Sequence, residues 1–549
     1  MQSLRSQKRG SMGLSNHKLL KGTLLLSVTG FITRILGFLY KIYLADLLGA
    51  KLLGIYQLIF PVYAICFTIY GAGMQTAISQ VIAASNSRQS GKVSPLRLFA
   101  AGTTLSLFLA FLLQGFVYTR ADWIALRFVM EPSLTPYLKI MCTLFPFCCL
   151  SACINGYYYG IQDAHVPAVS QIIEQLFRVL FVFSISMFAA VNASPEQSCR
   201  IAVWGLVTGE IAACIYNAVK LAHHCHKRKG GEYHLPQKIS KRHHTGLKNL
   251  LFLASTLTLT RLFITFLNSV ESVLLPAMLR KYGCSAQDAL SIYGVLTGMS
   301  LSFLFFPSTI TNSLAVMLIP SVAQAHAKQD KAMIQKSISA SIQYCLILGL
   351  LCTCLFLVFG RELGNVFFHN EDAGSYLVTL SWLCPFLYLG TTLTSIINGL
   401  EKTHITFLIT VASLGIKIAF LLFAVPVHGI RAYLIGLLVS QFIQVFLEIA
   451  YLYPYLTYTK NINGVRETAF DPIHWIAIPS LFLVPCGIAV KSSYQWLGSC
   501  LNQQYAVLRL GIAGGILCLA YGCYLIATGS ITLTASLRHS PFSPRRHQN

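Results

Sequence analysis

The chain is dominated by apolar windows of about 20 residues, which recur from Leu24 to Ala527 with mostly short polar connections between them. An α-helix rises 1.5 Å per residue, so a window of this length spans the hydrocarbon core of a bilayer. Only 11% of the residues are charged, against about 25% in soluble domains, and so little charge cannot cover a water-exposed surface. The pattern predicts an all-α membrane protein with about fourteen transmembrane helices and no soluble domain.

The windows also set the boundaries of the larger parts of the chain. The expected spans are 22–45, 53–84, 97–119, 137–160, 166–190, 201–222, 248–276, 290–324, 337–360, 376–400, 404–425, 430–455, 472–490 and 505–527. We divide the chain into a cytoplasmic N-terminus (1–21), an N-lobe of helices 1–6 (22–222), a basic cytoplasmic linker (223–247), a C-lobe of helices 7–12 (248–455), helices 13–14 (456–527) and a cytoplasmic tail (528–549).

The net charge of +23 follows from basic residues that gather in alternate connections between the windows. The richest of these lie before Leu24, at 88–97, at 220–248 and at the C-terminal end. This alternation is a topology signal rather than a nucleic-acid footprint, and no nucleic-acid partner is expected. Under the positive-inside rule, it predicts a multi-pass protein of the bacterial cytoplasmic membrane with an even number of spans and both termini in the cytoplasm.

Three other features bear on processing and metal binding. The first window is longer than the h-region of a signal peptide and lacks a small-residue cleavage site, so we expect it to stay in the mature protein. The seventeen cysteines fall mostly inside apolar windows without a CxxC pair and resemble small buried hydrophobes. The histidine-rich run 223–244 has metal binding as an alternative, but we interpret it as a solvated linker that contacts anionic lipid. No metal site or cofactor is predicted.

Two pairs of segments about 240 residues apart indicate an internal duplication. Residues 54–84 match 291–325 through an Ile-Tyr pair, a mid-helix proline and a small or polar central stretch. Residues 146–168 match 385–407 through Pro-Phe at one end and Ile-Asn-Gly followed by a histidine at the other. The repeats lie six helices apart, an even number, so they share one orientation in the membrane. We therefore expect two pseudo-symmetric lobes around a central cavity, with helices 13 and 14 outside the duplication.

The second helix of each half carries residues that allow a helix to bend. These are Pro61, Gly71 and Gly73 in helix 2, and Pro307 and Pro320 in helix 8. Backbone carbonyls freed at such places are tolerated in a membrane where they line a cavity or find another donor. We predict that these residues act as hinges, and the alternative is that they only shape helix packing.

Several basic residues lie inside apolar windows, where an arginine costs about 2.5–3.5 kcal/mol and must face protein or water. Arg34 and Lys41 are seven residues apart in helix 1, close to two full turns, so they share one face. Arg261 occupies in helix 7 the position of Arg34 in helix 1. Cations that face one cavity attract an anion, and arginine favours bidentate contact with phosphate or carboxylate. These three residues are the predicted substrate-binding groups; for Lys41, the alternative is snorkelling to the interface near Asp46.

A second group of charges forms a candidate ion or charge network. Glu174 and Arg178 are an i,i+4 pair on helix 5 with the acid first, the favoured order, and mutual neutralisation is the alternative reading. Glu271 follows Arg261 by ten residues, about 15 Å along the axis, which is too far for direct pairing. Further charges that the sequence does not place are Glu210, Lys417 and Glu448. If transport uses a coupling ion, the sequence does not distinguish H⁺ from Na⁺.

Three stretches resemble the MOP (multidrug/oligosaccharidyl-lipid/polysaccharide) exporter superfamily, and within it the stage V sporulation protein B-like and MurJ-like flippases. The stretches are KGTLLLSVTGFITRILGFLYKIYLADLLGA (21–50), the GIYQLIFPVY run that begins at Gly54, and INGYYYGIQDAHVPAVSQIIEQLFRV (154–179). The similarity covers essentially the whole chain, and Thr-Arg-Ile-Leu-Gly-Phe (33–38) is its most specific part. The resemblance implies fourteen helices in two lobes around a central cavity that alternates between inward-open and outward-open states.

The resemblance also implies a function, namely export of a lipid-linked, pyrophosphate-bearing saccharide such as lipid II or a polysaccharide precursor. Its implied partners are this anionic saccharide, membrane lipids and cell-wall synthesis proteins. Arg34 matches the first helix-1 arginine of the MurJ-like pattern, whereas Tyr40 and Lys41 stand where that pattern has a second arginine and an acid. This departure favours the sporulation and polysaccharide branch.

Two other functions compete with export of a lipid-linked sugar. The first is a cation-coupled multidrug antiporter of the same superfamily, which needs buried carboxylates, and only Glu174, Glu210 and Glu271 are candidates. The second is a polyprenyl-dependent membrane enzyme, which needs a metal or an acid/base carboxylate on an external loop. The Asp residues are scattered without a DxD pair, so we do not expect an enzyme.

Overall fold

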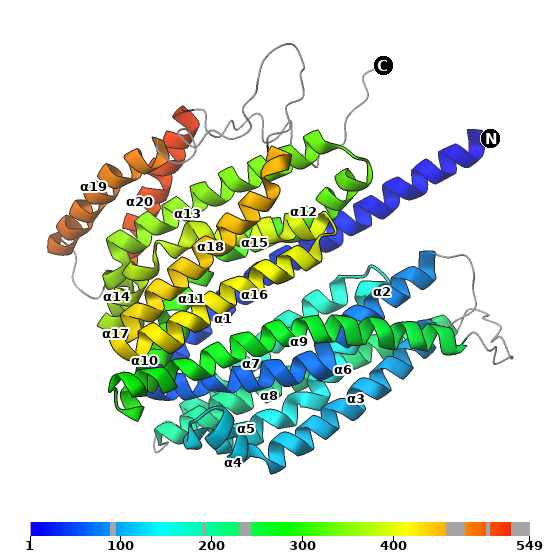
Figure 1. Ribbon diagram of the computed structural model, residues 1–549, viewed down its shortest axis with the longest axis horizontal. Coiled ribbons are helices and arrows are strands. Elements are labelled where there is room, and N and C mark those ends of the chain that lie inside the picture. Colours follow the sequence, from blue (N-terminus) through cyan, green and yellow to red (C-terminus); the bar gives the residue numbers. More distant parts are fainter. Residues whose placement is uncertain are drawn as a thin grey trace. The chain divides into compact units, whose positions relative to one another are not determined.

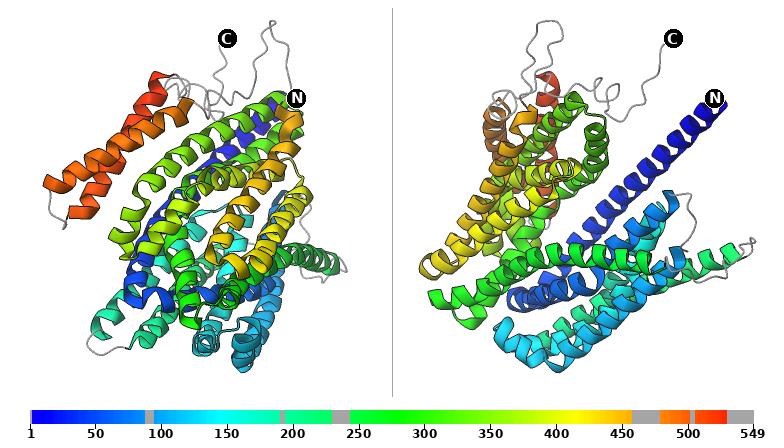
Figure 2. Two further views of the ribbon diagram at one scale, coloured as in Figure 1. Left: turned by 60° about the vertical axis from the view of Figure 1, so that its left-hand side comes forward. Right: turned by 45° about the vertical axis from the view of Figure 1, so that its right-hand side comes forward.

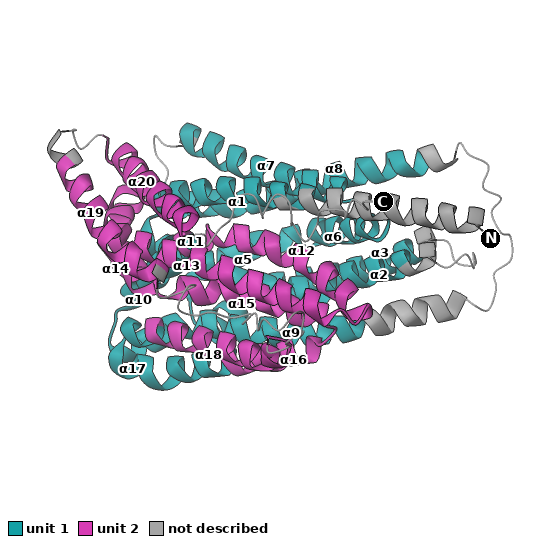
Figure 3. Ribbon diagram, turned by 90° about the horizontal axis from the view of Figure 1, so that it is seen from above, with its two compact units in different colours: residues 1–302, 414–433 teal, residues 303–413, 434–549 magenta. Residues whose placement is uncertain are grey.

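The computed structural model describes residues 2–87, 95–189, 194–229, 243–456, 478–500 and 505–528, and every regular element in these ranges is a helix (Figure 1). The all-α fold class is therefore confirmed. Two compact units are formed, unit 1 from residues 1–302 and 414–433 and unit 2 from residues 303–413 and 434–549 (Figure 3). Their boundaries differ from those of the predicted lobes, and the division into lobes stays a prediction.

Unit 1 contains the helices that match the first seven predicted spans and the start of the eighth. Its longer helices are α1 (Gln2–Phe67), α2 (Gly73–Ser87), α3 (Pro95–Thr119), α6 (Phe145–Gly160), α7 (His165–Ala189), α8 (Pro195–Lys229), α9 (His243–Tyr282) and α10 (Ala286–Gly294). Its short helices are η1 (Thr68–Ala72), α4 (Ala121–Trp123), η2 (Ile124–Phe128), η3 (Pro132–Leu134), α5 (Thr135–Met141), η4 (Cys142–Leu144), η5 (Val295–Ser300), η6 (Phe420–Ala424) and α17 (Val425–His428). Within the unit, α7 packs on α8, α6 packs on α2 and α3, and α1 contacts α7, α9 and α10.

The first two predicted spans are joined by a single kink rather than by a loop. Helix α1 runs through the expected connection, and only Gly49 leaves the helical conformation, with φ 68° and ψ 170°. A positive φ of this kind favours glycine because a Cβ would clash with the backbone. Residues 28–83 would be about 84 Å long as one straight helix, whereas a bilayer core is about 30 Å thick. The kink at Gly49 therefore separates two crossings.

The helices that carry the predicted hinge residues are irregular. Pro61 lies inside α1, Gly71 belongs to the π-helix η1, and Gly73 begins α2. The eighth predicted span contains the π-helix η5 and a turn at Phe306 and Pro307 before α12, and Pro320 lies inside α12. Gly73 also has a packing role, since a Cβ added there would lie 1.8 Å from the Thr258 hydroxyl of α9. Hinge motion at these positions stays a prediction.

Unit 2 is built mainly from long helices. They are α12 (Ser308–Ala327), α13 (Lys331–Phe368), α14 (Glu371–Leu380), α15 (Leu383–Gly399), α16 (Thr403–Ala419), α18 (Ile430–Leu456), α19 (Ile478–Cys500) and α20 (Ala506–Ala527), with the short α11 (Leu301–Phe305) at its start. Helices α19 and α20 lie side by side and pack on α13 (Figure 2). Their buried core includes Phe359, Leu483, Leu517 and Tyr521. The last two predicted helices thus share an apolar interface with α13, which contains the predicted span 337–360.

The expected number of fourteen spans is not confirmed. Each predicted window is helical in its described part, but eleven described helices are long and apolar enough to cross a membrane, or twelve with the bent pair α14 and α15. The first of the eleven, residues 28–83, contains two predicted spans. Large apolar side chains on α3 are exposed, among them Phe108, Phe111 and Phe116, as expected for a surface that faces lipid. Residues 230–242 of the predicted linker and 529–549 of the tail lie outside the described residues.

Candidate functional site

Helix α1 carries the predicted stripe of cations ahead of its kink. The helix is continuous from Arg34 to Lys41, so the seven-residue spacing places both residues on one face. The Arg34 side chain is exposed and forms no hydrogen bond or ion pair with the residues that the structure describes. Lys41 is half-buried, and its Nζ donates to the Ser302 hydroxyl at 3.2 Å rather than to Asp46. Neither cation has a carboxylate partner in the described part of the chain.

Arg261 binds the irregular part of helix 2. Its Nη1 donates to the carbonyl oxygen of Ala72, the last residue of the π-helix η1, at 2.9 Å. One turn further along α9, the Thr265 hydroxyl lies 3.3 Å from the Thr68 hydroxyl of η1. A guanidinium bound to a backbone carbonyl keeps its full charge, so Arg261 is a third cation without a carboxylate partner among the described residues. No described contact joins it to the α1 stripe.

The predicted pair on helix 5 is formed within α7. Arg178 makes an ion pair with Glu174 and also donates to Gln175 Oε1 at 3.4 Å. Helix α8 approaches this turn closely, since a Cβ on Gly209 would lie 2.6 Å from the Glu174 carbonyl oxygen. Small residues allow such close approach between membrane helices. The geometry fits mutual neutralisation of the two charges.

Glu271 has partners that sequence reasoning did not find. Lys417 of α16 places its Nζ 2.8 Å from Glu271 Oε2, and the Tyr433 hydroxyl donates to Oε1 at 2.5 Å. Both carboxylate oxygens of this buried group are thus bonded. The contacts tie α9 to residues 414–433 within unit 1. The only signal in the sequence was the unplaced charge of Lys417, because nothing local relates it to Glu271.

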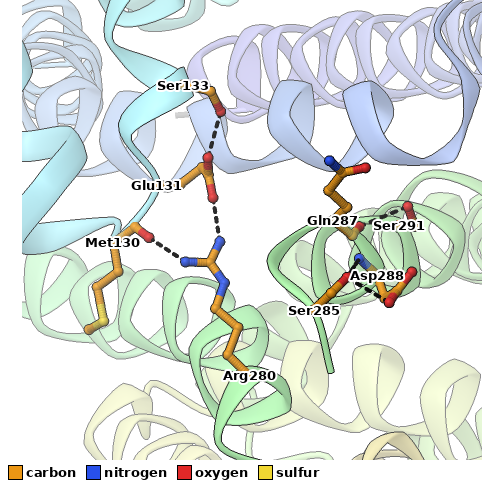
Figure 4. Close-up of polar contacts among 8 residues, drawn as sticks. All are labelled: Met130, Glu131, Ser133, Arg280, Ser285, Gln287, Asp288 and Ser291. Atoms are coloured by element: carbon orange, nitrogen blue, oxygen red, sulfur yellow. Dashed lines mark hydrogen bonds and ion pairs between the residues drawn. The ribbon is translucent and has the colours of Figure 1, made fainter. Parts of the chain in front are cut away.

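A second ion pair missed by sequence reasoning lies at the C-terminal end of α9 (Figure 4). Arg280 pairs with Glu131, which lies between η2 and η3, and it donates to the Met130 carbonyl oxygen at 2.9 Å. The Ser133 hydroxyl donates to the other oxygen of Glu131 at 2.6 Å. Figure 4 shows the guanidinium of Arg280 directed at Met130 and Glu131, and it also draws Ser285, whose hydroxyl caps α10. This clamp joins the connection between predicted helices 3 and 4 to that between helices 7 and 8.

Five described cations of unit 1 lie four or more residues inside a predicted span, and they fall into two classes. Arg178 and Lys417 are neutralised by carboxylates. Arg34, Lys41 and Arg261 have no carboxylate partner within the described ranges. An unpaired cation in a membrane is costly, so it marks a place where water or an anion is expected. The three unpaired cations are the three predicted substrate-binding residues, whose role stays a prediction.

Comparison with known proteins found a matching family and several relatives. A family described as "Polysaccharide biosynthesis protein" matches residues 19–285. The chain is 24% identical to Stage V sporulation protein B of Bacillus subtilis (strain 168) over 429 residues, 73% of this chain and 80% of that protein. It is 22% identical to the Lipid II flippase MurJ of the same organism over 422 residues, 73% of this chain and 76% of that protein. The chain is therefore similar in sequence to proteins of sporulation and to a lipid II flippase.

Solved structures show a similar fold. A structure of the Lipid II flippase MurJ in an inward closed conformation covers 92% of this chain and 100% of that one, with a TM-score of 0.61 and 12% identity. An inward-facing multidrug resistance MATE family transporter of the MOP superfamily covers 80% of this chain and 100% of that one, with a TM-score of 0.58 and 12% identity. This fold and the apolar helices long enough to cross a membrane identify a multi-pass membrane protein, as the sequence predicted.

Proposed function

We propose that this protein is a transporter of the MOP superfamily, and that it moves a lipid-linked, pyrophosphate-bearing saccharide, such as lipid II or a polysaccharide precursor, across the bacterial cytoplasmic membrane by alternating access. The observation that carries the proposal is the α1 stripe, where Arg34 and Lys41 share one face and neither is neutralised by a described carboxylate. Two cations in a low-dielectric setting favour an anion of more than one charge. The similarity to a lipid II flippase supports a lipid-linked sugar as the source of that anion.

The two residues of the α1 stripe would contribute different contacts to a bound anion. The planar guanidinium of Arg34 offers a bidentate contact to a phosphate, and Lys41 adds a compact charge about two turns along the helix. Arg261, on α9, is the predicted third contact. The lipid tail stays in the bilayer while the headgroup crosses, and the bends near Pro61 and Pro307 are the predicted hinges of this movement. Outward transfer of an anion with charge about −2 gains roughly 4–5 kcal/mol at an inside-negative 100 mV.

The competing antiporter function is disfavoured by the ion pairs. A drug or cation site needs an available carboxylate, but two of the three predicted candidates form ion pairs, Glu174 with Arg178 and Glu271 with Lys417, which leaves Glu210. Ethidium efflux from cells that express this protein, with no effect on cell-wall precursors, would support the antiporter instead.

The proposed function is tested by complementation of a strain depleted of its lipid II flippase. The wild-type protein should restore growth, Arg34→Lys should restore it in part, and Arg34→Ala should fail although it inserts normally. Arg127→Ala is the control, because Arg127 is an exposed arginine in η2, away from the α1 stripe. Full growth with Arg34→Ala would contradict the role of the stripe, and failure of the wild-type protein would contradict lipid II as the substrate.

A further inference from the structure

Unit 2 contains a buried carboxylate that the proposed function does not use. Glu448 lies on α18, and only 1% of its surface is exposed. Its Oε1 accepts hydrogen bonds from the Thr394 hydroxyl of α15 at 2.6 Å and from Gln444 Nε2, one turn earlier on α18, at 3.2 Å. Its Oε2 is buried without a hydrogen-bond partner among the described residues. One oxygen of this carboxyl group is therefore hydrogen-bonded to the protein, and the other has no described hydrogen bond.

The surroundings of Glu448 provide no counter-charge. Helix α15 has no charged residue, and Arg431, the other charge on α18, is about 25 Å away along the helix axis. Helix α16 packs on both, because Thr406 donates to Asn398 of α15 and Ser413 donates to the Ser440 carbonyl of α18. The titratable or charged side chains of the neighbouring elements belong to α16, to the helices packed on α15 and to the last turns of α18. They are His404, Lys417, His326, Lys331, Lys336, Tyr344, Cys345, Cys352, Cys354, Arg361, Glu362, Tyr451, Tyr453 and Tyr455.

None of these side chains forms an ion pair with Glu448 in the part of the chain that the structure describes, and Lys417 is paired with Glu271. A buried carboxylate ion without a counter-charge is strongly unfavourable. Adding a proton to Oε2 removes the charge and leaves the hydrogen bonds to Oε1 in place. The geometry of the site thus suits a group that holds a proton.

The internal duplication places a second acid at the matching position of the first half. The sequence Glu-Ile-Ala occurs at 210–212 and at 448–450, with the offset of about 240 residues that relates the other repeated segments. The hydroxyl residue four positions before the repeated Asn-Gly is Ser151 in one half and Thr394 in the other. Glu210 is buried near Ser151 without a hydrogen bond to it, whereas Glu448 accepts a hydrogen bond from Thr394. Each half therefore places an acid against a hydroxyl of a neighbouring helix.

The two halves differ in the charges around this acid. Glu210 lies near both Glu174 and Arg178, so the ion pair of α7 is part of its surroundings. Glu448 has only neutral neighbours among its hydrogen-bond partners, namely Thr394 and Gln444. Burial of Glu448 is therefore favourable only when its own carboxyl group is protonated and neutral, because no neighbouring cation offsets its charge.

A proton fits this site better than a metal cation. Hard metal ions take about six or more oxygen ligands. Beside Glu448, the Thr394 hydroxyl and the Gln444 amide both turn donors toward the carboxyl group. About two turns before Glu448, helix α15 also lies close to α18, since a Cβ on Gly390 would be 2.8 Å from the Gln441 amide nitrogen. The close approach and the donors disfavour a coordination shell.

We propose that Glu448 is a proton-binding site of unit 2 and that transport is coupled to the exchange of this proton. A proton from water on one side of the membrane binds Oε2 of the carboxylate to give a neutral acid, and it returns to water on the other side. Only the O–H bond is made and broken. The coupling rests on the transport function proposed above, whereas proton binding does not.

Proton binding is tested on the purified full-length protein in lipid vesicles by infrared difference spectroscopy between alkaline and acidic pH. The wild type should show the carbonyl stretch of a buried protonated carboxylic acid. That band should be absent in Glu448→Gln, displaced in Glu448→Asp, and unchanged in Glu401→Gln, in which the exposed acid after α15 is replaced. Thr394→Val keeps the acid but removes one donor, so it should shift the band. An identical band in wild type and Glu448→Gln would refute the site.

Coupling is tested in the same vesicles with lipid II as the probe. An imposed pH gradient should change the wild-type initial rate several-fold, and Glu448→Gln should give one rate with or without the gradient. A Glu448→Gln protein that still responds to the gradient, or a wild type that responds to Na⁺ but not to pH, would refute the coupling. Absence of lipid II transport by the wild type would instead contradict the proposed substrate, and the infrared result would still decide whether Glu448 binds a proton.

Discussion

Glu271 and Lys417 form a buried pair whose two charges both lose their hydration. Such a pair is stable only when its geometry is good and the remaining lone pairs are satisfied. Here the ammonium lies 2.8 Å from one carboxylate oxygen, and the Tyr433 hydroxyl lies 2.5 Å from the other. Loss of either charged partner would leave an uncompensated charge in the membrane. The network therefore acts as a structural tie between α9 and residues 414–433.

Replacing Glu271 with Gln should destabilise the purified protein by about 3–5 kcal/mol, because Lys417 then stays buried without a counter-charge. Lys417→Met in the same chain should recover most of this loss, since both charges are then absent. Thermal unfolding of the two single variants and the double variant gives a double-mutant cycle. Lys491→Met is the control, because Lys491 lies 3.9 Å from Glu362 and is 44% exposed, so about 0–1 kcal/mol is expected. Strict additivity of the two buried changes would contradict the tie.

Lys41 should contribute to transport through its charge rather than through its hydrogen bond. Lys41→Met should lower the rate of lipid II transport in vesicles about 10-fold or more. The reason is that a hydrogen bond between the ammonium and the anionic substrate would contribute about 1.5–3 kcal/mol. Lys41→Arg should retain most of the rate. Ser302→Ala removes the only described partner of the ammonium and should leave transport near the wild-type rate. A wild-type rate with Lys41→Met would show that this lysine only anchors the helix.

Sequence reasoning found the residue pairs that helix periodicity determines and missed the others. The ion pair of Glu174 and Arg178 follows from i,i+4 geometry within one helix, and the structure forms it. The partner of Glu271 lies far along the chain, and the spacing of residues within a helix does not determine which helices become neighbours. Charge alone marked Lys417 as unusual, but tertiary packing was needed to pair it.

At the scale of elements, two glycines allow α1 and α10 to cross with their backbones in contact. A Cβ on Gly54 would lie 2.2 Å from the Leu290 carbonyl oxygen, and a Cβ on Gly294 would lie 2.1 Å from the Ala50 carbonyl oxygen. Backbone atoms cannot turn away as a flexible side chain can. Small residues at such crossings are a common means of packing helices in membranes.

Gly294→Ala should therefore destabilise unit 1, by at least the roughly 1–3 kcal/mol typical of overpacking. Gly54→Ala should act in the same direction at the same crossing. Gly115→Ala in α3 is the matched control, because no atom lies within 4 Å of the added Cβ, and alanine is the better helix former. Thermal unfolding of the three purified variants checks the prediction. Equal unfolding temperatures for Gly294→Ala and Gly115→Ala would show that the crossing has room to separate.

The elements also show which parts of the fold hydropathy can predict. Apolar windows located the helices because burial in lipid requires them, and each window is helical in its described part. The expected loop near residue 50 is instead one residue, Gly49, inside a continuous helix. The π-helices η1 and η5 were not predicted, because a π-helix needs no change in composition. The prolines indicated irregular helices without giving the form of the irregularity.

At the scale of the molecule, the clamp of Arg280 and Glu131 constrains the topology of unit 1. Glu131 lies between predicted helices 3 and 4, and Arg280 lies between predicted helices 7 and 8. Their ion pair requires both connections to lie on the same side of the membrane. The alternation of basic residues places both connections on the outer side. The contact and the charge pattern therefore agree on an even number of crossings between the two residues.

The sequence predicts an even number of crossings through the whole chain, which would place the N-terminus and the C-terminus on the same side, and the positive-inside rule predicts that this side is the cytoplasm. Alkaline phosphatase, which is active only after export, should be active when fused after Arg120 and inactive when fused after Lys229 or Asn549. Green fluorescent protein, which becomes fluorescent in the cytoplasm, should give the reciprocal pattern. An active phosphatase at Asn549 together with an inactive one at Lys229 would mean an odd number of crossings after residue 229, and would remove one helix from the predicted fourteen. Activity at both positions would instead reverse the orientation, place Glu131 and Arg280 in the cytoplasm and contradict the charge argument.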